Sequence, residues 1–179
     1  ALRAMLRNHP QLRACLRFVE HVAETKNESL GVMILSALPT ATAVQALDTM
    51  ATRAAGVGKA EQVLWAANAL RRLELAPELS LALASVASLV AGDTQASATY
   101  AEQADQMGPN HAGVQERLAM VRLLAGDQKA ARVAAVKAVM GGSVDALAAA
   151  LVASGLVEQG QVRDARRIFV VQRVGDTLG

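Results

Sequence analysis

The sequence predicts an all-α fold of about five stacked helix pairs, and three observations support this prediction. Apolar residues make up 53% of the 179 residues but aromatic residues only 2%, which suits closely packed helices better than a β-sandwich or barrel. Four prolines leave long stretches free of helix-breaking residues. Glycine recurs every 34 residues, at Gly58, Gly92, Gly126 and Gly160. We therefore expect units near 10–43, 44–77, 78–111, 112–145 and 146–179.

Small residues at fixed distances from these glycines predict where two helix backbones approach closely. They lie seven places before the glycine at Ser85, Ala119 and Ala153, and five places after it at Ser97, Ala131 and Ala165. The residues before each glycine also have the spacing of one helix face, as in Leu81, Ala84 and Ser88. Each unit is thus expected to be a helix, a tight glycine turn and a second helix.

The first two units depart from this pattern. Arg17 takes the small position of the first unit and Glu24 replaces its glycine, while Val63 and Leu70 take small positions in the second. Arrays of repeats need such atypical pairs to close their apolar ends. We predict a single domain over 1–179, with degenerate or capping units over 10–77 and three better-matching repeats over 78–179. Since the chain begins at Ala1, we expect it to be part of a longer protein.

The 34-residue unit resembles the tetratricopeptide repeat (TPR). Within 78–111 the resemblance rests on Ser85, Gly92, Ser97, Ala104 and Pro109, at positions 8, 15, 20, 27 and 32 of the unit. It covers residues 78–171, although the aromatic positions 4 and 11 of the family pattern are unfilled. It implies a TPR-like superhelical solenoid of about five helix-turn-helix units, the first two degenerate. A closed alanine-rich bundle remains the alternative.

In this family, the first helix of each unit lines a concave groove that binds a partner. The resemblance places Leu79, Ala82, Val86, Leu89, Val90, Glu116, Met120 and Leu123 in that groove. Because these residues are mostly apolar, the groove is expected to receive an apolar or amphipathic segment of a partner protein. The alternative is that the same side chains are buried core.

Charge is spread unevenly along a chain whose net charge is only +2. Arginines gather at both ends, at Arg3, Arg7, Arg13, Arg17, Arg163, Arg166 and Arg167, whereas the stretch from Leu73 to His111 has acids and no Lys or Arg. The arginine-rich ends are therefore candidates for contacts with a charged partner or with another copy of the chain. Contacts of the second kind would make the protein a homo-oligomer. The alternative is a solvated helix face without a specific role.

Catalytic, metal and nucleic-acid sites are not indicated by the sequence. Cys15 is the single cysteine, and it lies about 240° round a helix from His21, so the two do not face each other. Three scattered histidines do not suggest a metal site. Stacking aromatics near the arginines are limited to Phe18 and Phe169. We expect no enzyme activity, no cofactor, no metal, no nucleic-acid partner and no direct membrane insertion.

The function predicted is therefore a non-catalytic protein-protein interaction scaffold. The Ala-, Arg- and Val-rich composition is bacterial in style, and such chains resemble periplasmic repeat modules of polysaccharide-export and secretion machines. The resemblance favours the periplasm over the cytoplasm. Three alternatives stay open: a chaperone similar to those of type III secretion, a self-assembling scaffold, and a regulatory arm of a larger enzyme or transcription factor.

Overall fold

The computed structural model describes residues 10–25 and 27–168 of the chain. Every regular element within these ranges is an α-helix, so the predicted all-α class is confirmed for them. The chain divides into two compact units, with the boundary between Met107 and Gly108. We call them the N-terminal unit (described over 10–25 and 27–107) and the C-terminal unit (described over 108–168).

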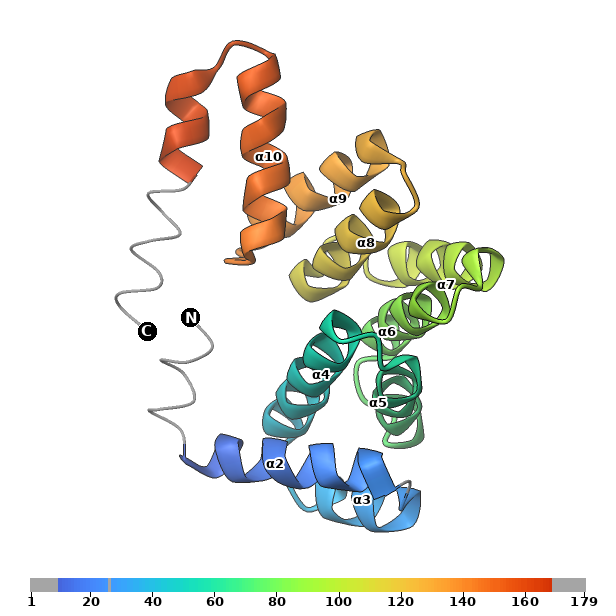
Figure 1. The fold of residues 1–179 in the computed structure, drawn as a ribbon. Helices are drawn as coiled ribbons and strands as arrows, with labels where there is room; N and C mark the ends of the chain where they lie inside the picture. Colours follow the sequence, from blue (N-terminus) through green and yellow to red (C-terminus); the bar gives the residue numbers. More distant parts are fainter. Residues whose placement is uncertain (1–9, 26, 169–179) are drawn as a thin grey trace. The chain divides into compact units, whose positions relative to one another are not determined.

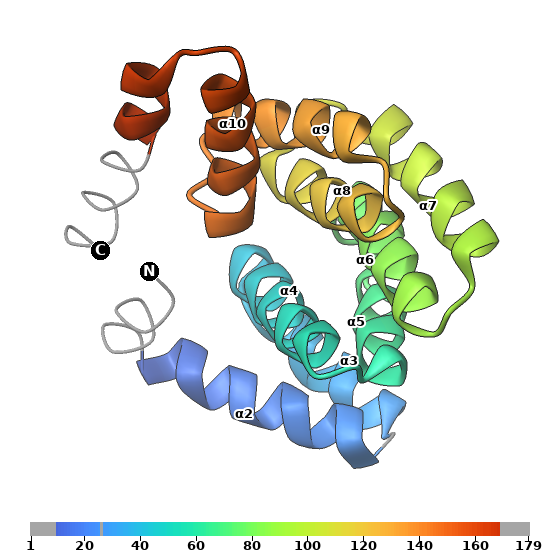
Figure 2. The same cartoon turned by 45° about the horizontal axis from the view of Figure 1, so that its top comes forward.

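The N-terminal unit consists of helices that pack against their neighbours in the chain (Figure 1). They are α2 (Pro10–Thr25), α3 (Glu28–Ser36), α4 (Thr40–Gly56), α5 (Ala60–Arg72), α6 (Pro77–Val90) and α7 (Thr94–Met107). The closest pairs are α4 with α5, α5 with α6, and α6 with α7, and Figure 2 shows the same neighbours from another side. Helices α4, α5 and α6 thus each pack against the next helix, and α2 packs against α4 as well as α3.

Helix α4 begins earlier than the sequence predicted. The expected unit boundary was at residue 44, whereas α4 starts at Thr40. Pro39 precedes it with φ −55° and ψ 135°, an extended conformation in which the chain leaves the preceding turn and enters the helix. The helix therefore starts four residues before the unit boundary expected near residue 44, directly after Pro39.

The recurring glycines make the turns that the sequence predicted. Gly58, Gly92, Gly126 and Gly160 all have positive φ, between 74° and 86°. At Gly126 the turn is closed by two backbone hydrogen bonds, from Gly126 N to Leu123 O and from Asp127 N to Arg122 O. This is the left-handed helix end that glycine adopts without strain, because it has no Cβ to crowd the neighbouring carbonyl.

Replacing one of these glycines is expected to destabilise the protein through backbone strain alone. Gly58 has φ +74° and open space where a Cβ would lie, so Gly58→Ala should lower the free energy of unfolding by about 1–2 kcal/mol without a clash. Gly56 is the last residue of α4, directly before this turn, and it also has open space where a Cβ would lie. Gly56→Ala is the matched control, and denaturant melts should show it neutral or stabilising. Equal losses in both variants would contradict the assigned turn geometry.

Close helix approaches occur where the small residues predicted them. Ser85 and Ser97 are fully buried or nearly so, and the Ser85 hydroxyl donates to the Ser97 carbonyl at 2.8 Å, which joins α6 to α7. On the other side of α6, the Ser80 hydroxyl donates to the Ala67 carbonyl of α5 at 2.8 Å. Short hydroxyl side chains can make these bonds only when the two backbones lie close together, so the bonds fix the hairpin spacing.

The first helices close one end of the N-terminal unit around Trp65. This side chain is 8% exposed, and its ring lies against the backbone of α3 at Gly31, where an added Cβ would meet ring atom Cζ2 at 2.7 Å. Glycine is therefore required for this close approach. Ion pairs from Arg53 to Glu20 (2.7 Å) and from Lys59 to Glu24 (3.6 Å) tie the end of α2 to α4 and to the α4–α5 turn.

The C-terminal unit repeats the hairpin arrangement. It contains α8 (Ala112–Leu124), α9 (Gln128–Met140), α10 (Ala146–Glu158) and a helical stretch over residues 162–168. Helix α9 packs against both α8 and α10 (Figures 1 and 2). Asp127 and Asp145 begin α9 and α10 as N-caps, each accepting a backbone N–H at 2.9 Å. Within the described ranges, none of the helices combines the length and apolar character needed to span a membrane.

Candidate functional site

The predicted groove residues of α6 are mostly packed inside the protein. Leu79, Ala82 and Val86 are 3%, 0% and 1% exposed, and Leu89 and Val90 are half-buried. Helix α6 packs against α5 and α7 in the same unit, as the two serine bonds show. In this structure the first three side chains are therefore core, which is the alternative that the sequence left open, and they offer no surface to a partner.

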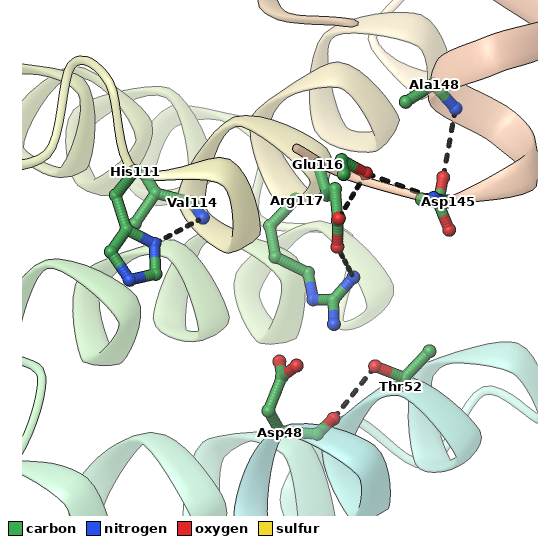
Figure 3. Close-up of polar contacts among 9 residues, drawn as sticks. Asp48, Thr52, His111, Val114, Glu116, Arg117, Asp145 and Ala148 are labelled. Atoms are coloured by element: carbon green, nitrogen blue, oxygen red, sulfur yellow. Dashed lines mark hydrogen bonds and ion pairs between the residues drawn. The ribbon is translucent and has the colours of Figure 1, made fainter. Parts of the chain in front are cut away.

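The predicted groove residues of α8 are half-buried, and one of them has a structural role. Met120, Leu123 and Glu116 are all of intermediate exposure. Glu116 accepts a short hydrogen bond from the Ser143 hydroxyl and forms an ion pair with Arg117 at 3.6 Å (Figure 3). The Ser143 hydroxyl in turn accepts from the Asp145 backbone N–H at 3.0 Å.

This chain of polar contacts joins α8 to the connection that precedes α10. Asp145 then caps α10 by accepting from Ala148 N, as Figure 3 shows. His111, the residue before α8, caps the start of that helix, with its Nδ1 accepting from Val114 N at 3.3 Å. The polar residues of this region thus position helices, and Glu116 is held by neighbours within its own unit.

The arginines predicted as charged contacts lie in different parts of the chain, and the structure describes only some of them. Arg3 and Arg7 lie outside the described residues, and Arg13 lies on α2, where only the backbone is described. Arg17 is exposed on α2 in the N-terminal unit. The others, Arg163, Arg166 and Arg167, are exposed on the helical stretch 162–168 in the C-terminal unit, where Arg167 pairs with Asp164 at 3.1 Å.

An apolar cleft that the sequence did not predict lies between α9 and α10. Its volume is about 340 Å³, within the range of sites that bind ligands or side chains of a partner. It is lined by Arg132, Val133, Val136, Lys137, Leu151, Val152, Gly155, Leu156 and Gln159. All of these belong to one unit, so the cleft is formed by two helices that pack directly against each other.

Helix α9 places its large apolar side chains toward solvent and its alanines toward the core. The buried face consists of Ala131, Ala134, Ala135 and Ala138, each 0% exposed. Val133, Val136 and Met140 are 50%, 41% and 83% exposed, and at spacings of three and four residues they share one face. Hydrophobic burial normally favours the reverse arrangement, so this face is an apolar surface that water solvates at a cost.

A charged pair joins the two helices at this cleft. Arg132 of α9 donates from Nη1 to Glu158 Oε2 of α10 at 2.5 Å and from Nη2 to Oε1, while Nη2 also reaches the Ser154 hydroxyl at 3.3 Å. The two parallel bonds form the fork geometry in which arginine binds a carboxylate most strongly. The hydrogen bond from Arg132 lowers the pKa of Glu158 below its ordinary value, and the bond to Glu158 raises the pKa of Arg132.

The pair is expected to make stability depend on pH in acid. Because the pKa of Glu158 is lower in the folded state than its ordinary value of 4.5, its stabilising effect is present above that pH and is lost as the pH falls through the folded-state pKa. The melting temperature of wild type should exceed that of Glu158→Gln at pH 7, and the difference should shrink below about pH 4.5. Glu102→Gln, at an exposed glutamate of α7, is the control for losing one charge. A difference that is unchanged at pH 3 would contradict the pairing.

The described part of the chain does not bring together the side chains that a metal site would need. Among the described residues, no group of three or more His, Cys, Asp or Glu side chains is placed to hold a metal ion. Cys15 is half-buried and unbridged, and His111 serves as a helix cap. The C-terminal unit offers instead an apolar cleft with cations among its lining residues, an arrangement that can bind apolar groups.

A signal for the cleft was present in the sequence of α9. Reading QKAARVAAVKAVM as a helix places Ala131, Ala134, Ala135 and Ala138 on one side, and Val133 and Val136 with Met140 on another. The small residues mark the close approach to α8 and α10, so the larger apolar residues are left to face outward. Comparison of the sequence with protein-family models and with curated proteins finds no match to either.

Proposed function

We propose that this chain is a non-catalytic protein-protein interaction scaffold of the TPR-like solenoid type, which binds a segment of a partner protein. The support for the solenoid lies in the recurrence of hairpins. Helices α7 and α9 begin 34 residues apart, at Thr94 and Gln128, and glycines of positive φ precede both. A closed bundle has no reason to repeat its turns and its small buried residues at one spacing.

The observation that carries the scaffold role is the outward-facing apolar surface of α9 beside the α9–α10 cleft. Val133, Val136 and Met140 are exposed, although the same helix buries only alanines. A soluble protein gains stability by burying such side chains, and an exposed apolar surface beside a cleft is typical of a site that a partner covers. The binding site proposed here is therefore this cleft, in place of the α6 groove residues that are core.

Capture from an extract of the native cells tests this proposal. The baits are wild type, Val136→Asp in the cleft and Val57→Asp as control, since Val57 is a 70% exposed valine in the α4–α5 turn of the other unit. Both changes place the same new charge on an exposed valine, so both variants should fold. A partner held by wild type and by Val57→Asp, and lost with Val136→Asp, is the expected result. A partner held equally by all three baits would exclude the cleft as the binding site.

The identity of the captured protein also tests the proposed biological setting. We propose a module of a bacterial envelope machine, for polysaccharide export or secretion, because the composition and repeat style resemble such modules. An export enzyme or channel component as the cleft-dependent partner would support that setting. A secreted client would instead favour the chaperone, and a second copy of the chain would favour the self-assembling scaffold.

A further inference from the structure

We infer that the α9–α10 cleft receives an amphipathic helix of a partner protein whose polar flank is acidic. This inference rests on the proposed function and adds the conformation and the charge of the bound segment. Its supports are the apolar floor of the cleft, the absence of a sheet edge beside it in the described chain, and the sign of the charges along α9.

The floor and rim of the cleft fit apolar side chains projecting from a partner. Val133 and Val136 line the cleft from α9, and Val152 and Leu156 line it from α10. Met140 extends the exposed apolar face of α9 beyond the lining residues. From Val133 to Met140 the face runs about 10 Å along the helix, at a rise of about 1.5 Å per residue. That length matches about two turns of a partner helix lying along the cleft.

The partner segment must satisfy its own backbone hydrogen bonds. The wall of the cleft is made of two α-helices, whose interior N–H and C=O groups are already paired within each helix. Residues 10–25 and 27–168 contain no strand, so this part of the chain cannot add an extended segment to a sheet edge. Backbone N–H and C=O groups of the bound segment that lie over the apolar floor need hydrogen-bond partners. A helical segment supplies these hydrogen bonds within itself.

Cations outnumber acids along the cleft. Helix α9 carries Lys129, Arg132 and Lys137 and no acidic residue. Two of these cations are among the residues that line the cleft, and those lining residues include no carboxylate. Glu158, the acid at the edge, is held by Arg132, so that pair is close to neutral in total. Lys129 is exposed and lies one turn before Val133 on the same face. A partner helix with Asp or Glu beside its apolar stripe therefore complements this surface.

Designed peptides test the inference directly. Three labelled peptides of equal length are used. The first has a Leu/Val stripe flanked by Glu, and the second has the same stripe flanked by Lys. The third contains the residues of the first in scrambled order, so that it has no apolar stripe. Their binding to the full chain is measured by fluorescence anisotropy at low and high salt. The acidic amphipathic peptide should bind about tenfold more tightly than the basic one, and this preference should shrink at high salt. The scrambled peptide should not bind.

Variants of the chain locate the effect. Val136→Asp should abolish binding of the acidic peptide, while Val57→Asp should leave it unchanged. Lys129→Glu should weaken the preference for the acidic peptide, whereas Lys59→Glu, the same charge reversal in the N-terminal unit, should not. Loss of the preference in both lysine variants alike would show a long-range effect of net charge and would overturn the assignment to this cleft.

The remaining outcomes separate failure of the inference from failure of the proposed function. Equal binding of acidic and basic peptides, both lost with Val136→Asp, would overturn the acidic flank and leave the cleft as a scaffold site. No binding of any peptide would overturn the inference, and the capture experiment would then judge the scaffold role separately. Self-association of the chain that Val136→Asp abolishes would identify a second copy as the occupant and would overturn the inference.

Discussion

Val86→Arg is expected to abolish cooperative folding or to lower the free energy of unfolding by about 4 kcal/mol or more. Val86 is 1% exposed on α6, whose neighbours in the N-terminal unit are α5 and α7. An arginine there has to bury a charge without a built partner, or force the helices apart. Since a domain is stable by only about 5–15 kcal/mol, such a loss is large.

Val133→Arg provides the matched control for this result. Val133 is 50% exposed on α9, so the same change should alter the free energy of unfolding by no more than about 0.5 kcal/mol. Circular dichroism and denaturant melts of both variants give the comparison. A Val86→Arg variant that folds with wild-type stability would show that the α6 residues form an open groove. The proposed binding site would then move from the cleft back to α6.

Ala131→Leu is expected to lower the free energy of unfolding by about 1–3 kcal/mol. Ala131 is 0% exposed at the close approach of α9 and its neighbours, and three further methyl-sized groups have no space there. The added side chain would push α9 away from α8, against which it packs. Thermal or denaturant melts measure the loss.

The control for Ala131→Leu is the same substitution at an exposed alanine of the next helix. Ala150 lies on α10 and is exposed, so Ala150→Leu should leave stability within about 0.5 kcal/mol of wild type. An unchanged melting temperature for Ala131→Leu would mean that the small residues do not mark the helix contacts, and the 34-residue register would lose its physical basis.

The sequence predicted the turns and the close contacts well because single residues determine them. A positive φ is accessible to glycine and costly for other residues, so the recurrence of Gly126 and its equivalents is enough to mark the hairpin turns. A serine or alanine is needed where two backbones approach closely, which is why Ser85 and Ala131 mark buried positions. Both signals are local, and both recur with the repeat.

The accessible surface was harder to predict because it depends on how helices pack. Val86 and Val133 are the same residue type on amphipathic helices, yet one is core and the other is exposed. The difference arises because alanines make the helix contacts of α9, which carries Val133. The valine is therefore left exposed to solvent. The Arg132–Glu158 pair likewise joins residues 26 apart, and no spacing rule connects them in the sequence.

Thiol reactivity at positions 86 and 133 tests most directly where the accessible apolar surface lies. Val86→Cys and Val133→Cys are prepared separately in a Cys15→Ser background, so that each chain has one thiol, and their rates of reaction with a thiol reagent are compared under native conditions. The thiol at position 133 should react like an exposed thiol, and the thiol at position 86 at least about 100-fold more slowly, because it is reached only by local unfolding. Similar rates at the two positions would contradict the account, because the α6 residues would then be as accessible as the α9–α10 cleft.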